Sequence, residues 1–245
     1  MYHFFAPEAA SEDGILILSG ENAHHIGRVL RLAVGERVVV SDGQDCDRYC
    51  EIAGYRGRDV VLRVLPESVP EAELPVRIRL FQGVPKSDKM EWIVQKAVEL
   101  GAAGIVPVQM KRCVVKLDEK QKTARRERWQ KLAESAAKQS GRRVLPAVGP
   151  VMTFREAAAE AASADRILVP YESADDMEKT RQLLGSLRPG MSVAVFIGPE
   201  GGFDPEEIRI LQEAGAEIIT LGRRILRTET AGMAFLAMCL LMTEQ

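Results

Sequence analysis

The apolar residues follow one pattern in the first part of the chain and another in the rest. From Val38 to Leu65 short runs rich in β-branched side chains are separated by polar turns that contain glycine. This pattern predicts a small antiparallel β unit. Residues 66–75 hold three prolines and three glutamates, which disfavour both a helix and a central strand. We therefore expect two domains, residues 1–70 and residues 71–245.

Beyond residue 75 apolar runs alternate with amphipathic stretches that have the period of a helix. The runs are as long as buried strands and lie at residues 77–84, 104–110, 165–171, 192–198 and 217–222. Alternation of this kind is typical of an α/β domain built on a mainly parallel sheet.

Two of the amphipathic stretches carry clear helix signals. Asp88 can cap the first helix, with Glu91 in the position of a capping box, and Gly101 can end it. The second helix ends at Gly141. Their apolar stripes consist of Met90, Ile93, Val94, Ala97 and Val98 in the first helix, and of Trp129, Leu132, Ala133 and Ala136 in the second.

Length and composition narrow the class of protein. With 245 residues, 46 % of them hydrophobic, the chain can bury a substantial core. It has no apolar run of about eighteen residues and no leader-like start, so we expect a soluble cytoplasmic protein without membrane contact. The spacing of the cysteines and the few histidines favours no metal site. These residues are Cys46, Cys50, Cys113 and Cys239, and His3, His24 and His25.

The net charge of −2 conceals a basic stretch from Lys111 to Lys131. Nine lysines and arginines face only three acidic residues there. Such a segment could contact the phosphates of a nucleic acid. It could equally be the solvated face of a helix, and charge alone does not separate the two interpretations.

The most informative motif runs from Val193 to Glu207. An apolar strand leads into a Gly-Pro-Glu-Gly-Gly loop, after which Asp204, Pro205 and Glu207 signal the start of a helix. A phosphate cradle would need lysine or serine in this loop, whereas Glu200 would repel a phosphate. The loop therefore favours a nucleoside or a cationic ligand, and S-adenosylmethionine is both. The alternative is a tight turn that needs glycine only for its dihedral angles.

A second motif lies near the end of the chain. The strand at residues 217–221 leads into a loop with Arg223, Arg224 and Arg227, followed by Glu229 and an apolar helix that Thr228 or its neighbour caps. In a parallel sheet such a loop lies at the carboxyl edge, where ligands bind. A surface ion-pair site is the alternative.

Together these two motifs resemble the cofactor-binding signature of the SPOUT methyltransferases, specifically the RsmE family, which methylates N3 of uracil in 16S ribosomal RNA. Residues 25–31 resemble the family's N-terminal motif, residues 89–101 its first long helix and residues 134–142 its Gln-Ser-Gly-Arg helix end. The resemblance thus extends along nearly the whole chain. Lys138 stands where the family usually has glutamate, so any role of that acid does not carry over.

The resemblance implies a fold and a substrate. The fold would be a PUA-like antiparallel β-barrel, followed by a trefoil-knotted α/β domain with a mainly parallel sheet that forms a homodimer through its last helices. The substrate would be uridine 1498 of 16S ribosomal RNA in the small ribosomal subunit. The cofactor would be S-adenosylmethionine, bound by Leu168, Pro170, Glu172, Ile197, Gly198, Pro199, Glu200, Gly201, Gly202, Leu221, Gly222, Ile225, Leu226, Thr230 and Ala231.

Methylation of uridine N3 requires that the N3 proton be removed and that the charge spreading onto O2 and O4 be stabilised. Glu200 and Glu229 are the candidate bases, and Arg227 is the candidate cation. Orientation of the two substrates could also supply much of the acceleration by itself. The candidate phosphate contacts are Arg28, Arg31, Lys86, Lys89, Arg112, Lys116, Arg142 and Arg143, each of which could instead be an ordinary solvated side chain.

Two other functional classes make different demands on the sequence. A nucleotide-dependent oxidoreductase would need a GxGxxG motif after an early strand, and the chain has none. A non-catalytic RNA-binding protein on the same scaffold would keep the basic residues but could lose Glu200, Arg227 and Glu229, all of which are present.

Overall fold

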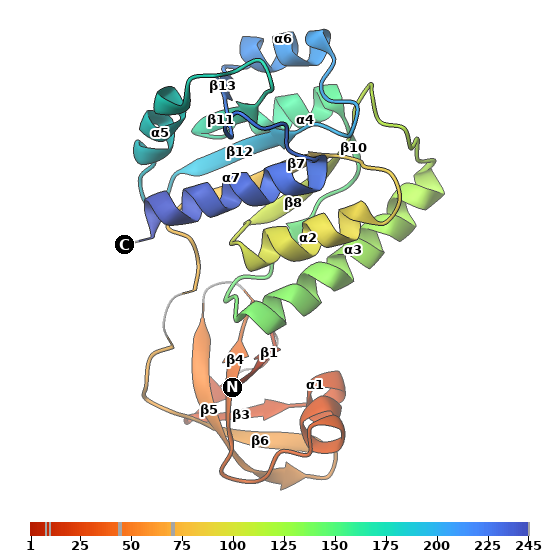
Figure 1. Cartoon of the computed structure of the whole chain (residues 1–245). Coiled ribbons are helices and arrows are strands. Elements are labelled where there is room, and N and C mark those ends of the chain that lie inside the picture. Colours follow the sequence, from red (N-terminus) through yellow and green to blue (C-terminus); the bar gives the residue numbers. More distant parts are fainter. Residues whose placement is uncertain (8, 10, 44–45, 70–71, 245) are drawn as a thin grey trace. The chain divides into compact units, whose positions relative to one another are not determined.

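The computed structural model describes residues 1–7, 9, 11–43, 46–69 and 72–244. The chain forms two compact units (Figure 1). The first consists of Met1–Glu73 and Ala137–Leu145, and the second of Leu74–Ala136 and Pro146–Gln245. A short segment from the middle of the chain therefore belongs to the N-terminal unit. The boundary predicted between residues 70 and 71 falls outside the described residues and stays a prediction.

The N-terminal unit is built on one mostly antiparallel sheet. Its strand order is β1-β4-β5-β6-β3-β2, and among the described residues only the pairing of β1 with β4 is parallel. Leu16, Ile52 and Leu62 are among the fully buried residues of its core. The predicted β unit is confirmed, with strands β1 (Tyr2–Phe5), β2 (Ser11–Glu12), β3 (Ile15–Leu18), β4 (Arg37–Ser41), β5 (Asp47–Arg56) and β6 (Asp59–Val64).

Between β3 and β4 the chain forms α1 (Gly20–His24), which continues directly into the π-helical turn η1 (His25–Val29). Arg31 follows with a φ of 52°, in the left-handed region that residues other than glycine rarely adopt. The backbone is therefore constrained where the sequence resembles the family's N-terminal motif.

The second unit contains a fully parallel sheet in the order β10-β8-β7-β12-β11-β13, with β9 paired to β8. All five predicted apolar runs form strands, so the predicted α/β architecture is confirmed. The stacked rings of Phe81 and Phe196, on neighbouring central strands, are fully buried. The strands are β7 (Arg77–Gly83), β8 (Gly104–Gln109), β9 (Ala147–Val148), β10 (Met152–Thr153), β11 (Arg166–Pro170), β12 (Ser192–Ile197) and β13 (Glu217–Ile219).

Helices cover this sheet. In Figure 1, α2 and α7 lie in front of the strands, and both pack against each other and against the sheet. On the described residues no helix combines the length and the apolar character needed to cross a bilayer. The helices are α2 (Lys89–Glu99), α3 (Glu119–Ser140), α4 (Phe154–Ala161), α5 (Met177–Gly185), α6 (Pro205–Glu213) and α7 (Thr228–Thr243).

The helix ends agree with the sequence signals in part. The predicted capping box of α6 is present, since Asp204 accepts a hydrogen bond from the Glu206 amide and Glu207 accepts one from the Asp204 amide at 2.9 Å. The predicted side-chain cap of α2 is wrong, because Asp88 makes no such bond. The residue before it, Ser87, has a φ of 57°.

The start of α7 agrees with the prediction in position only, because the N-cap residue is the neighbour of Thr228. Arg227 occupies the N-cap position without a side-chain cap. The Thr228 hydroxyl instead donates to the Gly198 carbonyl at 2.6 Å and accepts from Gln82 at 2.8 Å. It therefore joins α7 to the ends of β7 and β12, a tertiary contact that local sequence rules cannot reveal.

Candidate active site

A cleft of about 690 Å³ lies where β11, β12 and β13 end, at the carboxyl edge of the parallel sheet. Loops that follow parallel strands meet at this edge, so residues far apart in sequence come together there. Three such loops form most of its wall, at residues 170–172, 197–203 and 220–228, and Lys86, Lys89 and Ala231 complete it.

The glycines of the 197–203 loop are needed for close approach of the backbone. A Cβ on Gly201 would lie 2.9 Å from the Arg112 Cβ and 3.0 Å from the Arg112 carbonyl oxygen, and a Cβ on Gly198 would lie 3.2 Å from the backbone of Gly202. The Arg112 guanidinium also donates to the Gly201 carbonyl at 3.2 Å. The loop is thus tightly packed, and its glycines do more than permit a turn.

Two carboxylates and one ammonium meet in this cleft. The Lys89 Nζ lies 3.1 Å from the Glu200 Oε1 and 3.1 Å from the Glu229 Oε2. The three side chains are 26 %, 21 % and 18 % exposed. Glu200 also accepts from the Lys86 amide at 3.3 Å. Residues from α2, from the loop after β12 and from the first turn of α7 therefore share one ion-pair cluster.

This cluster keeps both acids ionised. Burial acts to raise the pKa of Glu200, but hydrogen bonds from its own amide, from Lys89 and from the Lys86 amide outweigh burial, so the pKa lies below its ordinary value. Burial likewise acts to raise the pKa of Glu229, and its own amide, Lys89 and Arg227 together lower it. The pKa of Lys89 is raised, mainly by its contact with Glu200 and further by its contact with Glu229. Burial of Lys89 acts in the opposite direction.

Arg227 projects into solvent at the rim of the cleft. Its side chain is 83 % exposed, and its Nη1 lies 4.0 Å from the Glu229 Oε1. The neighbouring Arg223 and Arg224 also line the cleft and are exposed. The site therefore combines acids at its wall with exposed cations at its rim, which suits a ligand that carries charges of both signs.

Most residues predicted to bind the cofactor come together at this cleft. Leu168 does not line it, because its side chain is buried within β11, and neither does the exposed Thr230 on α7. The binding roles of the others stay predictions. The residues that line the cleft are Pro170, Glu172, Ile197, Gly198, Pro199, Glu200, Gly201, Gly202, Leu221, Gly222, Ile225, Leu226 and Ala231.

Sequence reasoning missed two aromatic residues of the cleft. The rings of Tyr171 and Phe203 meet edge to face with centroids 6.3 Å apart. Each directly follows a predicted cofactor-binding residue, Pro170 or Gly202, and that position after a strand end or a glycine loop was the signal available. Thr220 and Thr228 were also missed.

The predicted RNA contacts fall into several environments. Lys86 and Lys89 line the cleft, and Arg112 packs on the Gly201 loop. Lys116 is exposed on the connection between β8 and α3. In the N-terminal unit Arg28 is exposed on η1, and Arg31 follows it. The structure thus leaves Arg28, Arg31 and Lys116 with the exposure that a phosphate contact needs.

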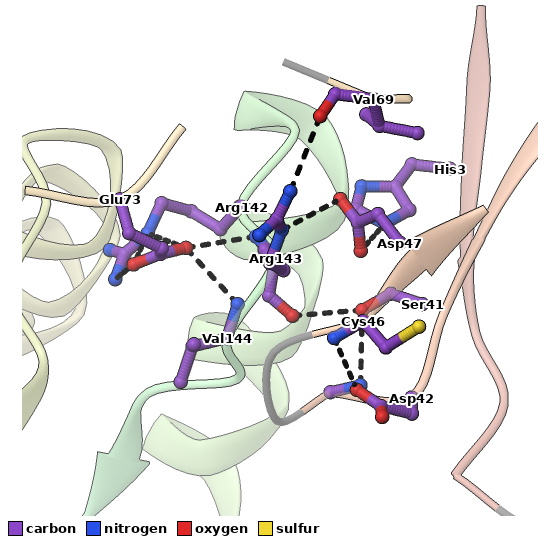
Figure 2. Close-up of polar contacts among 11 residues, drawn as sticks. His3, Ser41, Asp42, Cys46, Asp47, Val69, Glu73, Arg142, Arg143 and Val144 are labelled. Atoms are coloured by element: carbon purple, nitrogen blue, oxygen red, sulfur yellow. Dashed lines mark hydrogen bonds and ion pairs between the residues drawn. The ribbon is translucent and has the colours of Figure 1, made fainter. Parts of the chain in front are cut away.

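Arg142 and Arg143 are instead part of a polar cluster within the N-terminal unit, shown in Figure 2. Arg142 is 2 % exposed, and its Nε lies 2.9 Å from both Glu73 carboxylate oxygens. The backbone amides of Arg143 and Val144 donate to the same carboxylate at 2.8 and 3.0 Å. This burial argues against a phosphate contact by Arg142, since its guanidinium does not reach the surface.

The Arg143 side chain faces the same interior. Its Nη2 donates to the Val69 carbonyl at 3.2 Å, and its Nε lies 3.9 Å from the Asp47 carboxylate (Figure 2). Asp47 is almost fully buried. Both arginines therefore tie residues 137–145 to the N-terminal unit.

The cysteines are buried or half-buried, and on the described residues they are free thiols. Burial raises the pKa of Cys50 and Cys113 to about 11 and that of Cys239 to about 12. No group of histidine, cysteine and acidic side chains within the described ranges is arranged to hold a metal ion.

Comparison with known proteins identifies the family. Residues 72–240 match the family model described as an RNA methyltransferase domain, and residues 18–64 match that of an RNA methyltransferase PUA domain. Over 230 residues the chain is 36 % identical to ribosomal RNA small subunit methyltransferase E of Bacillus subtilis, covering 93 % of this chain and 90 % of that protein. The chain belongs to the RsmE family.

Two further members of the RsmE family are similar over most of their length. The protein of the same name from Mycobacterium bovis is 30 % identical, with 93 % of this chain and 87 % of that protein covered. The crystal structure of the Neisseria gonorrhoeae member, which contains bound S-adenosylmethionine, aligns with a TM-score of 0.82 at 31 % identity, covering 99 % of this chain and 98 % of that one. The predicted family and fold class are confirmed.

Proposed function

We propose that this protein transfers the methyl group of S-adenosylmethionine to N3 of a uridine in 16S ribosomal RNA, with uridine 1498 as the family's target. The observation that supports this most is the glycine-walled cleft, in which ionised carboxylates and exposed arginines meet at the carboxyl edge of an RNA methyltransferase domain. The substrate assignment is supported by the relatives named as methyltransferases of small-subunit ribosomal RNA.

The cleft fits the cofactor in size and in chemistry. Its volume of about 690 Å³ lies in the range of small-molecule sites. The close-packed glycine loop lets a flat nucleoside approach the backbone, and Tyr171 and Phe203 offer apolar ring edges. The acids of the wall suit a sulfonium and an ammonium group, whereas the arginines of the rim suit a carboxylate. S-adenosylmethionine supplies a methyl group on a positively charged sulfur.

The chain's own residues have two tasks in this reaction, to accept the N3 proton and to stabilise the charge that develops on uracil. Glu200 and Glu229 are ionised and can accept a proton, although their low pKa makes them weak bases. Glu229 is the better placed acceptor, because Arg227 lies beside it and can hold the uracil oxygen that gains charge. As the N3–methyl bond forms, the N3 proton passes to the carboxylate and the sulfur leaves as a neutral thioether.

RNA has to reach the rim of this cleft. Uridine exposes N3 only after it leaves base pairing, so the protein must also contact the RNA backbone outside the cleft. We expect the N-terminal unit to bind part of the RNA. This is supported by the match to the PUA domain model and by the exposure of Arg28 and Arg31. Lys86, Arg112 and Lys116 are the candidates on the methyltransferase unit. A substrate of this kind, the small ribosomal subunit or its RNA, supports a cytoplasmic location for the enzyme.

The protein also forms a homodimer in this proposal. Helix α7 is apolar on nearly all sides, yet Leu241 and Met242 near its end are exposed, and so is Trp92 on the adjacent α2. A helix of this kind at a surface normally packs against another protein. A second copy of the same chain would cover this surface.

A methyl-transfer assay on small ribosomal subunits tests the function. With labelled S-adenosylmethionine and subunits from a strain that lacks the modification, we expect one methyl group per subunit, found on uridine N3 by nucleoside mass spectrometry. Calorimetry should show binding of S-adenosylmethionine but not of NAD or ATP. Binding of NAD or ATP without any methyl transfer would contradict the proposal.

A further inference from the structure

Lys89 occupies a position that local stability does not favour. It is the first residue of α2, where the partial positive charge of the helix end repels a cation. The residue before the helix, Asp88, provides no side-chain cap, and Ser87 is held at a φ of 57°. Departures from local rules persist where the surrounding structure holds them, and they cluster at functional sites.

The tertiary contacts explain why a cation stands there. Lys89 lies between two carboxylates from different loops, at 3.1 Å from each. The Glu229 Oε2 is buried and has no hydrogen-bond partner among the described residues, so the ammonium compensates its charge as an ion pair. Two neighbouring carboxylates without that cation would repel each other, which would raise the pKa of at least one of them.

We propose that Lys89 is a positioning residue for methyl transfer, which bridges Glu200 and Glu229 so that both carboxylates stay ionised and in place at the cofactor cleft. This inference rests on the proposed function of the cleft. In this role Lys89 pairs with the two acids of the site and does not bind an RNA phosphate. A Lys89 that moved to a phosphate would leave two acids without their shared counter-charge.

The other charged groups around the two acids cannot replace Lys89. Arg227 lies 4.0 Å from Glu229 but is exposed to solvent, which weakens its effect. Lys86 contacts Glu200 through its backbone amide, which carries no net charge. The remaining charged groups that line the cleft or pack on the loop are Glu172, Arg223, Arg224 and Arg112.

The variants Lys89→Met and Lys89→Arg test this role, with Lys96→Met as the matched control. Lys96 lies on the same helix, has the same 26 % exposure and pairs with one carboxylate, that of Glu99, at 2.7 Å, but it does not line the cleft. Each variant is assayed for methyl transfer to small ribosomal subunits from pH 3 to 9, a range that includes the wild-type acid limb, with kcat and KM determined separately.

We expect Lys89→Met to move the acid limb of the kcat profile to higher pH by about one unit or more, the size of shift that an adjacent opposite charge produces. Lys89→Arg should restore the wild-type limb, and Lys96→Met should leave it unchanged. Calorimetric binding of S-adenosylmethionine, which needs no turnover, should show the same displacement. This binding measurement tests the role of Lys89 even if the Lys89→Met variant has no turnover.

The outcomes separate the two proposals. Wild-type protein that binds the cofactor but methylates no ribosomal RNA would contradict the proposed function. Active wild-type protein together with a Lys89→Met variant whose acid limb and binding profile are not displaced would overturn the role of Lys89 alone. A fall in kcat without displacement would also overturn it, because a purely structural contact predicts that result.

Discussion

Two of the cation–carboxylate clusters among the described residues use the same chemistry for different ends. In the N-terminal unit the Glu73 carboxylate receives Arg142 and two backbone amides, and the Arg142 side chain is 3 % exposed. In the cleft one Lys89 ammonium serves two acids, and the Glu229 Oε2 lacks a hydrogen bond within the described structure.

The difference lies in how fully hydrogen bonds occupy the Glu73 carboxylate and the Glu229 carboxylate. A buried carboxylate whose oxygens already accept several hydrogen bonds holds chain segments together and has little left for a ligand. Carboxylates that share one cation at the wall of a cleft can still respond to a charged ligand or accept a proton. We therefore read the first cluster as structural and the second as functional.

The largest expected effect tests the structural cluster. Glu73→Gln leaves the Arg142 guanidinium buried without its counter-charge, which should lower the free energy of unfolding by about 3 kcal/mol. Urea unfolding followed by circular dichroism measures this loss. Calorimetric affinity for S-adenosylmethionine should stay unchanged, and a parallel loss of affinity would show that the two clusters are not separate in function.

The next effect tests the functional cluster. Arg227→Ala removes the exposed cation beside Glu229, and methyl transfer should fall about 100-fold or more, as when one group that stabilises developing charge is lost. The melting temperature should hardly change, because the side chain is 83 % exposed. Transfer at the wild-type rate would remove Arg227 from the mechanism.

A pH titration sharpens the comparison further. Although burial acts to raise the pKa of Glu73, Arg142 and the amides of Val144 and Arg143 lower it below its ordinary value of 4.5. Its contribution to stability is therefore complete above that value and is lost as the pH falls through the lower, folded-state pKa. Wild-type protein should lose stability below about pH 4.5 more steeply than Glu73→Gln, as measured by urea midpoints at successive pH values.

The smallest effect comes from an exposed ion pair of the N-terminal unit. Arg37 and Glu67 lie 3.1 Å apart, but both side chains are about half exposed. Glu67→Gln should change the free energy of unfolding by less than about 1 kcal/mol, because solvent screens such pairs. A loss as large as that of Glu73→Gln would mean that burial does not decide the strength of these clusters.

Local sequence signals predicted the elements and much of the cleft. The apolar runs became strands, and the capping box of α6 formed from Asp204 and Glu207 as expected. The Gly-Pro-Glu-Gly-Gly loop and the arginine loop could both be assigned to the carboxyl edge, because every strand of a parallel sheet ends there in the same direction. These features depend on residues within about ten positions of one another.

Contacts between distant segments could not be predicted in the same way. Lys89 was expected to contact phosphate, yet its neighbours are Glu200 and Glu229, more than a hundred positions away. Residues 137–145 belong to the N-terminal unit, where the Arg143 amide donates to Glu73. The Thr228 hydroxyl does not cap its own helix and instead donates to the Gly198 carbonyl, directly after β12. The charge of a side chain and its place in a periodic pattern show which interactions it can make. Only the tertiary structure decides which partner buries it and neutralises its charge.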